Sequence, residues 1–121
     1  MEIEIHQIDE TQIAEVISME IIIADAADGL DLLGNLYYQG FDRIIMQEKN
    51  IAHAFFDLKT GIAGEILQKF SNYRVRLAIV GDFSKYDSQS FKDFRLESNK
   101  LGHISFVDSL ALAIDQLSKR R

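Results

Sequence analysis

From residue 25 onward, short apolar runs alternate with longer amphipathic segments, and the 121-residue chain contains no proline that would interrupt them. We interpret the runs at 43–47, 75–80 and 104–107 as strands, because they are short, apolar and bounded by polar residues. The segments between them repeat apolar residues every three or four positions, as helices do. Strands that alternate with helices are parallel, because each helix returns the chain to the same edge of the sheet. The pattern therefore predicts an α/β fold.

An antiparallel hairpin is predicted before this alternating part. Residues 2–8 and about 13–19 read as strands, and the polar residues 9–12 are predicted to form the turn between them. The chain then has the order ββαβαβαβα, with a mixed sheet of about five strands joined by crossover helices. Because no linker or repeat divides the sequence, we expect a single domain over 1–121.

Polar residues mark where the predicted helices begin. Asp25 is a capping residue for the first helix, and Gly40 is placed to end it. The second helix is predicted over 57–73, the third after Ser90 and the last after Asp108. Each helix from the second onward therefore follows a strand through a connecting loop.

Charge and composition argue against several classes of function. A formal net charge of −6 repels nucleic acid and anionic lipid surfaces. The longest apolar stretch, 19–24, is far shorter than the ~20 residues that cross a bilayer. The acidic start, 1–4, does not have the pattern of a secretory signal, and the absence of cysteine rules out disulfides and thiol chemistry. We therefore expect a cytoplasmic protein that binds neither nucleic acid nor membrane.

The sequence holds no recognisable motif for a cofactor or a metal. His6, His53 and His103 show no metal-ligand spacing, and the glycine-rich motifs that bind phosphates or dinucleotides are missing. We therefore predict no cofactor, no metal site and no assignable catalytic residue.

Several polar residues follow the predicted strands directly. In open α/β sheets ligands gather outside the carboxyl ends of the strands, which here means the loops after 47, 80 and 107. The candidates in these loops are Glu48, Asp82, Ser84 and Lys85. Asp82 or Glu48 could act as acid or base there, and Lys59 or Lys85 could bind an anion.

The segment from 57 to 73 is the most informative part of the sequence. One face of its helical wheel is apolar, ends at Tyr73 and is predicted to pack on the sheet. The remaining candidates lie at its start and on the opposite face: Asp57, Lys59, Thr60, Gly61, Gly64, Glu65 and Gln68. A helix glycine costs roughly 0.5–1 kcal/mol relative to alanine, so two glycines on a solvated face indicate that something approaches that backbone. It could be the first helix with its Gly34, a partner protein or second subunit, or an anion or small ligand at the helix start.

Two family resemblances add to this reading. The stretches DGLDLLGNLYYQGFDRIIMQ and FFDLKTGIAGEILQKFSNYRVRLAIVGDFS resemble the core of a bacterial family known as domain of unknown function 4180, which brings no known activity. More distantly, the element order and the segment DLKTGIAG are similar to STAS domains of anti-sigma-factor antagonists. That resemblance implies that Asp57 and Gly61 match the aspartate and glycine of those domains, and that Thr60 stands at their phosphorylated hydroxyl. The chain departs from the STAS pattern by one inserted residue and by threonine in place of serine.

We therefore predict a non-enzymatic regulatory or protein-interaction module with a STAS-like fold. Its expected contact surface is the N-terminal half of the 57–73 helix with the loop at 82–85, and its expected partner is another protein or a second copy. Thr60 is the candidate for regulation by phosphorylation, with a capping role as the alternative. The alternative function is a small-ligand binder or enzyme that uses the carboxylates at the strand ends. A shallow, partly apolar surface would favour the first function, and a concave site with converging polar groups the second.

Overall fold

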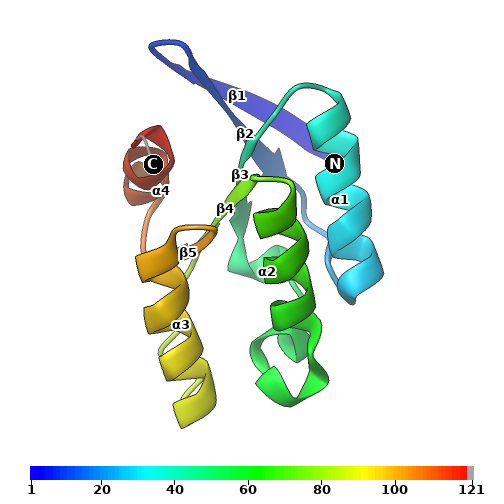
Figure 1. Ribbon diagram of the computed structural model, residues 1–121, viewed down its shortest axis with the longest axis vertical. Coiled ribbons are helices and arrows are strands. Elements are labelled where there is room, and N and C mark those ends of the chain that lie inside the picture. The colour runs from blue at the N-terminus through cyan, green and yellow to red at the C-terminus, as the bar shows by residue number, and fades with distance from the viewer. Residues whose placement is uncertain (120–121) are drawn as a thin grey trace.

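Helices and strands alternate as the sequence predicts in the computed structural model, which describes residues 1–119 (Figure 1). The elements are β1 (Glu2–Ile8), β2 (Thr11–Ile17), α1 (Ala26–Tyr38), β3 (Arg43–Gln47), α2 (Ile62–Asn72), β4 (Arg76–Val80), α3 (Gln89–Leu101), β5 (Ile104–Val107) and α4 (Leu110–Ser118). Three short 3₁₀ turns, η1 (Glu48–Asn50), η2 (His53–Phe56) and η3 (Leu58–Thr60), connect β3 to α2. The predicted order ββαβαβαβα and the mixed α/β class are confirmed.

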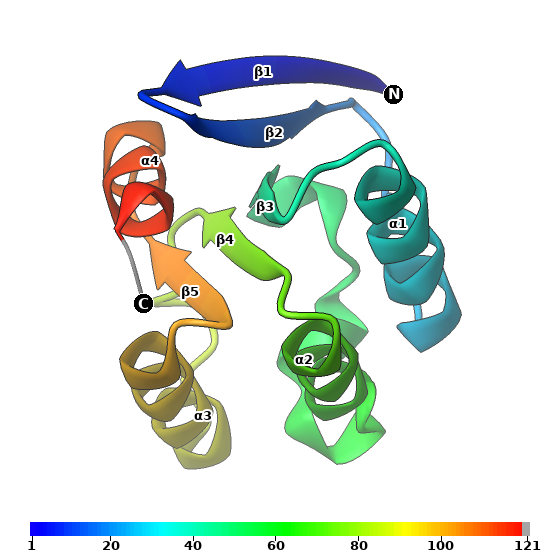
Figure 2. The ribbon, with the colours of Figure 1, turned by 45° about the horizontal axis from the view of Figure 1, so that its top comes forward.

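The five strands lie in the sheet in the order in which they occur in the chain. β1 pairs antiparallel with β2, and all later pairs are parallel. Three successive crossovers that advance in one direction, each right-handed, put their helices on the same face of the sheet. Accordingly α1, α2 and α3 cover one face, and α4 alone lies on the other (Figure 2).

Alternate side chains of each central strand enter two separate cores. Ile44 and Leu77 pack under the three helices, whereas their neighbours Ile45 and Ala78 pack against α4. All five residues of β4 are buried, as expected for a strand with parallel neighbours on both sides.

Two arginines fasten α4 to the sheet. Arg76, on β4, is 6% exposed, and its guanidinium donates to the carbonyl oxygens of Gln116 at 2.7 Å and Lys119 at 2.8 Å. Arg43, on β3, donates from Nε to the carbonyl oxygen of Leu117 at 2.7 Å. These carbonyls at the end of a helix have no partner within the helix, so the two arginines satisfy them with positive charge where the helix dipole favours it.

The hairpin turn is tighter than predicted. Only Asp9 and Glu10 form it, and Asp9 adopts a left-handed conformation with φ of 53°. The prediction of a turn over 9–12 is wrong at its end, because Thr11 already pairs with Ile8 and the second strand runs from 11 to 17. A two-residue turn matches the twist of the strands, so pairing continues up to it.

Two predicted helix starts are wrong by one or more residues. The helix placed over 57–73 begins at Ile62, because Gly61 before it is left-handed with φ of +78°. Ser88, not Ser90, caps α3 by accepting from the Phe91 N–H at 3.1 Å. The last helix begins after Asp108 as predicted, with Ser109 as its cap. The predicted cap at Asp25 is confirmed, since its carboxylate accepts from the Asp28 N–H at 2.9 Å.

None of the helices formed by residues 1–119 combines the length and the apolar character needed to cross a membrane.

Candidate functional site

The loops after β3 and β4 bring two of the predicted strand-end residues together. Glu48 begins η1 directly after β3, and the Lys85 amine lies 3.0 Å from its Oε1. The Tyr86 hydroxyl donates to the other carboxylate oxygen at 2.5 Å. Gly81 makes this meeting possible, because a Cβ there would lie 2.5 Å from the Cβ of Glu48. The carboxylate of Glu48 is therefore held by a cation and a phenol, with only 12% of the side chain exposed.

Tyr86 is a member of this site that the sequence does not reveal. Its ring stacks on Phe56 at 4.2 Å between centroids, and His53 lies against its edge at 6.0 Å. Burial, the hydrogen bond to Glu48 and the negative charge of Glu48 all raise the pKa of Tyr86 far above its ordinary value of 10. The phenol is therefore a hydrogen-bond donor at physiological pH and not a base.

The raised pKa of Tyr86 predicts a loss of stability in alkaline solution. Because the native state favours the neutral phenol, this stabilisation is complete below pH 10 and declines as the pH rises above the unfolded pKa. Between pH 8 and pH 11, the melting temperature of the parent should fall more steeply than that of Tyr86→Phe, which has no phenol to ionise at this position. Parallel curves for the two proteins would show that Tyr86 ionises as freely in the folded state as in the unfolded one.

An open hollow of about 340 Å³ lies beside this cluster. Its lining residues are His53, Phe56, Asp57, Lys85, Tyr86, Asp87 and Ser88. It brings Asp57, predicted for the start of the second helix, to the same place as Lys85, predicted for the strand-end loop. One member of each set of candidates therefore lies at this hollow.

Asp82 and Ser84 form a turn of their own. The Asp82 carboxylate accepts from the Ser84 N–H at 3.0 Å and from the Ser84 hydroxyl at 2.7 Å. These two hydrogen bonds lower the pKa of Asp82, so this exposed carboxyl stays ionised at neutral pH. Asp82 is thus engaged in its own loop and does not complete the Glu48 cluster.

Thr60 stabilises the turn before α2. Its hydroxyl lies 2.7 Å from the carbonyl oxygen of Ala54 and 2.8 Å from that of Asp57, and accepts from the Ile62 N–H at 3.3 Å. The Asp57 carboxylate accepts from the Lys59 N–H at 3.2 Å. These contacts support the capping role weighed for Thr60, and its phosphorylation stays a prediction.

Removing the Thr60 hydroxyl should destabilise the protein measurably. We expect Thr60→Ala to lower the free energy of unfolding by about 1 kcal/mol, because the Ile62 N–H and the carbonyl oxygen of Ala54 lose the hydroxyl as a partner. Thr60→Ser keeps the hydroxyl and should retain most of the stability. Urea unfolding of the three proteins tests this, and equal midpoints would mean that the hydroxyl contributes nothing.

The two glycines of the predicted helix face have different explanations. Gly61 is required by its left-handed backbone, whereas a Cβ at Gly64 would meet nothing within 4 Å. The idea that the first helix lies across these glycines through Gly34 is wrong, because Gly34 also has open space around it. The two helices meet instead at Gly29, whose Cβ would lie 2.6 Å from Cδ1 of Ile66. This close approach accounts for Gly29 and leaves Gly34 and Gly64 exposed.

Alanine substitutions should separate the open glycine from the packed one. Gly64→Ala is expected to stabilise the protein by up to ~1 kcal/mol, because alanine favours the helix and its methyl group enters open space. Gly29→Ala, the matched control, should destabilise it because the methyl group would overlap the Ile66 side chain. Thermal melting measures both, and a destabilised Gly64→Ala would show that a neighbour occupies that face.

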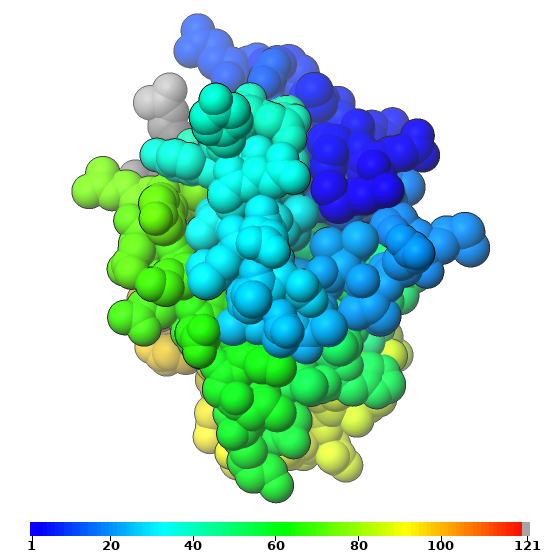
Figure 3. Space-filling view, turned by 90° about the vertical axis from the view of Figure 1, so that its right-hand side faces the viewer, coloured from blue at the N-terminus to red at the C-terminus, as the bar shows by residue number. Residues whose placement is uncertain are grey.

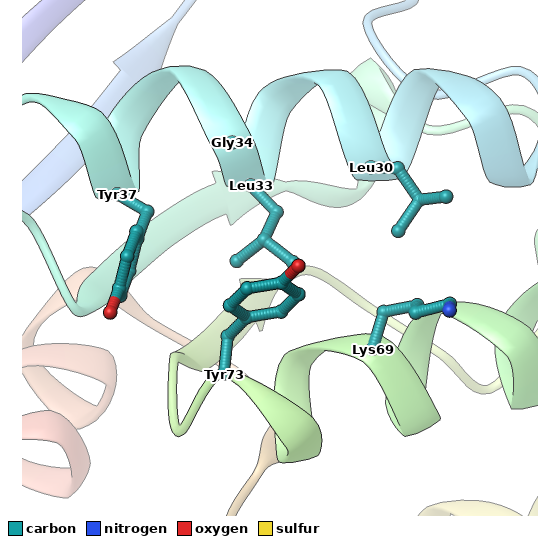
Figure 4. A pocket seen from close by; sticks show the side chains of 6 residues that line it. All are labelled: Leu30, Leu33, Gly34, Tyr37, Lys69 and Tyr73. Atoms are coloured by element: carbon teal, nitrogen blue, oxygen red, sulfur yellow. The ribbon is translucent and has the colours of Figure 1, made fainter.

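An apolar groove runs between α1 and α2, on the face shown in Figure 3 with α1 (cyan) between β1 (dark blue) and α2 (green). Its volume is about 270 Å³, and it is lined by Leu30, Leu33, Gly34, Tyr37, Lys69 and Tyr73. Leu30, Leu33 and Tyr37 point from α1 toward α2, and Tyr73 rises to meet them (Figure 4). We call this feature the α1–α2 groove.

Two tyrosines stand at one end of the α1–α2 groove. Tyr37 and Tyr73 are 51% and 54% exposed and meet edge to face, with 5.7 Å between ring centroids. The sequence places Tyr73 on the apolar face that packs on the sheet, which is wrong, because it follows the last residue of α2 and turns toward α1. Helical periodicity does not distinguish a residue that faces the sheet from one at the edge of the helix. The groove can therefore be recognised only when the positions of both helices are known.

Comparison with known families gives one match. The model of the family described as Domain of unknown function (DUF4180) matches residues 8–117, and the chain belongs to this family. No curated protein and no solved structure matches the chain.

Proposed function

We propose that this member of the DUF4180 family is a non-enzymatic protein-interaction module that receives a helix of a partner protein in the α1–α2 groove. The observation that carries the proposal is the pair of half-exposed tyrosines at the end of an apolar groove. Tyrosine is enriched in protein interfaces and among the residues that dominate binding energy, because a rigid ring supplies a large contact area. A shallow, partly apolar surface of this kind favours a protein over a small molecule.

The shape of the groove favours a helical partner. Leu30, Leu33 and Tyr37 line it from successive turns of α1, and Tyr73 closes it from α2. An amphipathic helix presents apolar residues at the same spacing of three and four, so its ridges fit such a groove.

The charge of the groove indicates what the partner helix carries. Lys69 is the one ionisable cation that lines it, and no carboxylate among residues 1–119 lies within salt-bridge distance of its amine. A partner carboxylate beside the apolar residues would pair with Lys69 and fix the orientation of the helix. We therefore assign to the partner an apolar stripe flanked by an acidic residue.

The proposed contact surface continues onto the N-terminal half of α2. Glu65 lies one helical turn before Lys69, Gly61 and Gly64 are exposed at the start of the helix, and Gln68 is exposed further along it. The open space around Gly64 allows a partner backbone to approach there. The proposal includes regulation by phosphorylation of Thr60, as the resemblance to STAS domains suggests.

The alternative of an enzyme or small-ligand binder has weaker support. Glu48 is already paired with Lys85 and Tyr86, and the ionised Asp82 is hydrogen-bonded within its own turn. A general acid or base must be free to reach the substrate, whereas both carboxylates are engaged by neighbouring side chains.

Site-specific photo-cross-linking in the source cells tests the proposal. A photoreactive phenylalanine analogue at Tyr37 should yield one cross-linked partner, and Lys69→Glu should abolish that product by repelling the partner carboxylate. The same analogue at Leu96, an exposed apolar residue on α3, is the matched control and should not yield it.

Two results would contradict the proposal. A product with twice the mass of the chain would make a second copy the occupant of the groove. A product pattern that is identical at Tyr37 and Leu96, or that survives Lys69→Glu, would show that the groove selects no partner.

A further inference from the structure

The β1–β2 hairpin gathers three potential metal ligands on one face. Glu4 and His6 lie two residues apart on β1 and therefore point to the same side of the strand. Glu15 on β2 is the direct cross-strand partner of Glu4. One ligand atom from each of the three side chains lies within 4.8 Å of the other two.

Two of these side chains already interact. His6 Nε2 lies 2.8 Å from Oε1 of Glu15, and Glu15 is 94% buried, with a relative exposure of 6%. Glu15 stands in register with Ile45 of β3, beside the core that packs against α4. A carboxylate in such a position needs a compensating cation, because burial of an unpaired charge is costly.

The position of Glu4 makes the need for positive charge greater. Side chains directly opposite each other in an antiparallel pair have Cβ atoms about 5 Å apart, and like charges there destabilise the sheet. Glu4 and Glu15 are such a pair, and the imidazole of His6 is the third group of the cluster. A divalent cation would neutralise both carboxylates at once.

We propose that Glu4, His6 and Glu15 form a binding site for a first-row divalent transition metal ion, with Zn²⁺ as its representative. One imidazole nitrogen and two carboxylate oxygens suit this class, whereas Ca²⁺ and Mg²⁺ prefer ligand sets made only of oxygen. Three protein ligands leave a fourth position of a tetrahedral ion for water or an exogenous ligand.

The geometry of the hairpin can accommodate the ion. Zn²⁺ bonds to nitrogen and oxygen are about 2.0–2.2 Å long, so adjacent ligand atoms in a tetrahedral shell lie about 3.3–3.6 Å apart. The ligand atoms of the cluster lie within 4.8 Å of one another. The ion would replace the hydrogen between His6 Nε2 and Glu15 Oε1, which lie 2.8 Å apart and would have to separate by about 0.5 Å. Rotation of the exposed Glu4 side chain would bring its oxygen to the same spacing. The bound ion would also tie β1 to β2, since the ligands come from both strands.

Glu15 lies beside an opening through which a hydrated ion could arrive. A hollow of about 220 Å³ is lined by Glu15 together with Ser18, Gln47 and Lys49, where β2 and β3 end. Residue Glu15 therefore borders a hollow that opens to solvent.

Titration of the chelator-treated full chain with Zn²⁺ in a calorimeter tests the site. We expect one ion per chain and a higher melting temperature with Zn²⁺. Loss of a residue that only hydrogen-bonds to a metal ligand lowers metal affinity about 10–100-fold. Glu4→Gln removes a direct ligand and should therefore weaken Zn²⁺ binding by about 100-fold or more. His6→Ala should do the same, and His53→Ala, outside the cluster, should leave binding unchanged.

Two further points keep the test decisive. Glu4 is exposed, so Glu4→Gln should fold even if His6→Ala, which deprives Glu15 of its partner, does not. X-ray absorption should show a zinc shell of nitrogen and oxygen ligands that includes one imidazole. Equal Zn²⁺ affinity in the parent and Glu4→Gln, or no binding by the parent, would overturn the proposal.

Discussion

Leu77→Asp is expected to leave the protein largely unfolded. Leu77 is fully buried in β4, where it packs under the helices that cover this face of the sheet. Placing an unpaired carboxylate there costs several kcal/mol, comparable with the entire stability of about 5–15 kcal/mol of a typical domain. Circular dichroism and thermal melting of the purified variant measure the effect.

Two controls show that the effect comes from the buried charge. Leu112→Asp introduces the same group at a leucine that is 49% exposed on α4 and should melt close to the parent. Leu77→Met changes shape but not polarity and should cost less than about 1.5 kcal/mol. If Leu77→Asp melts at the same temperature as Leu112→Asp, β4 is not the interior strand described above.

Arg76→Met should produce the second-largest loss of stability. The substitution keeps a similar apolar stem but removes the guanidinium that holds the carbonyl oxygens of Gln116 and Lys119. Hydrogen bonds to charged groups contribute about 1.5–3 kcal/mol each where they are buried, and we expect a loss of about 3 kcal/mol in the free energy of unfolding. Guanidinium chloride unfolding gives this value directly.

Arg43→Met is the matched control for Arg76. Arg43 reaches the same end of α4 with one hydrogen bond, to Leu117, and pairs with the exposed Asp42. Its loss should cost about 1 kcal/mol, and Arg76→Lys should fail to restore stability, since an ammonium cannot reproduce the planar fork. Equal losses for Arg43→Met and Arg76→Met would mean that the additional contacts of Arg76 do not stabilise α4.

The order of the elements follows from the sequence because it depends on local periodicity. Short apolar runs such as 43–47 and 104–107 have no other reading between amphipathic segments, and the structure gives strands with the same bounds. The ends of helices and strands were less predictable where the backbone conformation of a single residue sets them. The left-handed Gly61 shortens the second helix, and the left-handed Asp9 shortens the hairpin turn.

The candidate sites were less predictable because they depend on how elements lie against each other. The α1–α2 groove exists because α1 packs on α2 at Gly29, which leaves Gly34 open. The ligand cluster of the hairpin depends on the register that pairs Glu4 with Glu15, and a shift of one residue would turn one of the two to the other face. Neither arrangement can be derived from composition or spacing along one element.

The pairing of Glu48 with Lys85 was only partly predictable from the sequence. Both residues follow parallel strands, so the sequence places them at the same edge of the sheet. The contact itself depends on Gly81, which lets the loop after β4 pass directly over Glu48, and on Tyr86, whose ring is fixed by Phe56. The edge was predictable, and the hydrogen-bonded cluster was not.

Calorimetric titration of the chain with a synthetic peptide that spans the cross-linked partner helix tests the central claim most directly. Tyr73→Ala should weaken the affinity by about tenfold or more, as expected for an aromatic residue that dominates an interface. Gly34→Leu, which fills the α1–α2 groove without touching the core, should abolish binding while the melting temperature is maintained. Leu96→Ala should bind as the parent does. Equal affinity of the peptide for the parent, Tyr73→Ala and Gly34→Leu would contradict the proposal that the groove is the contact surface.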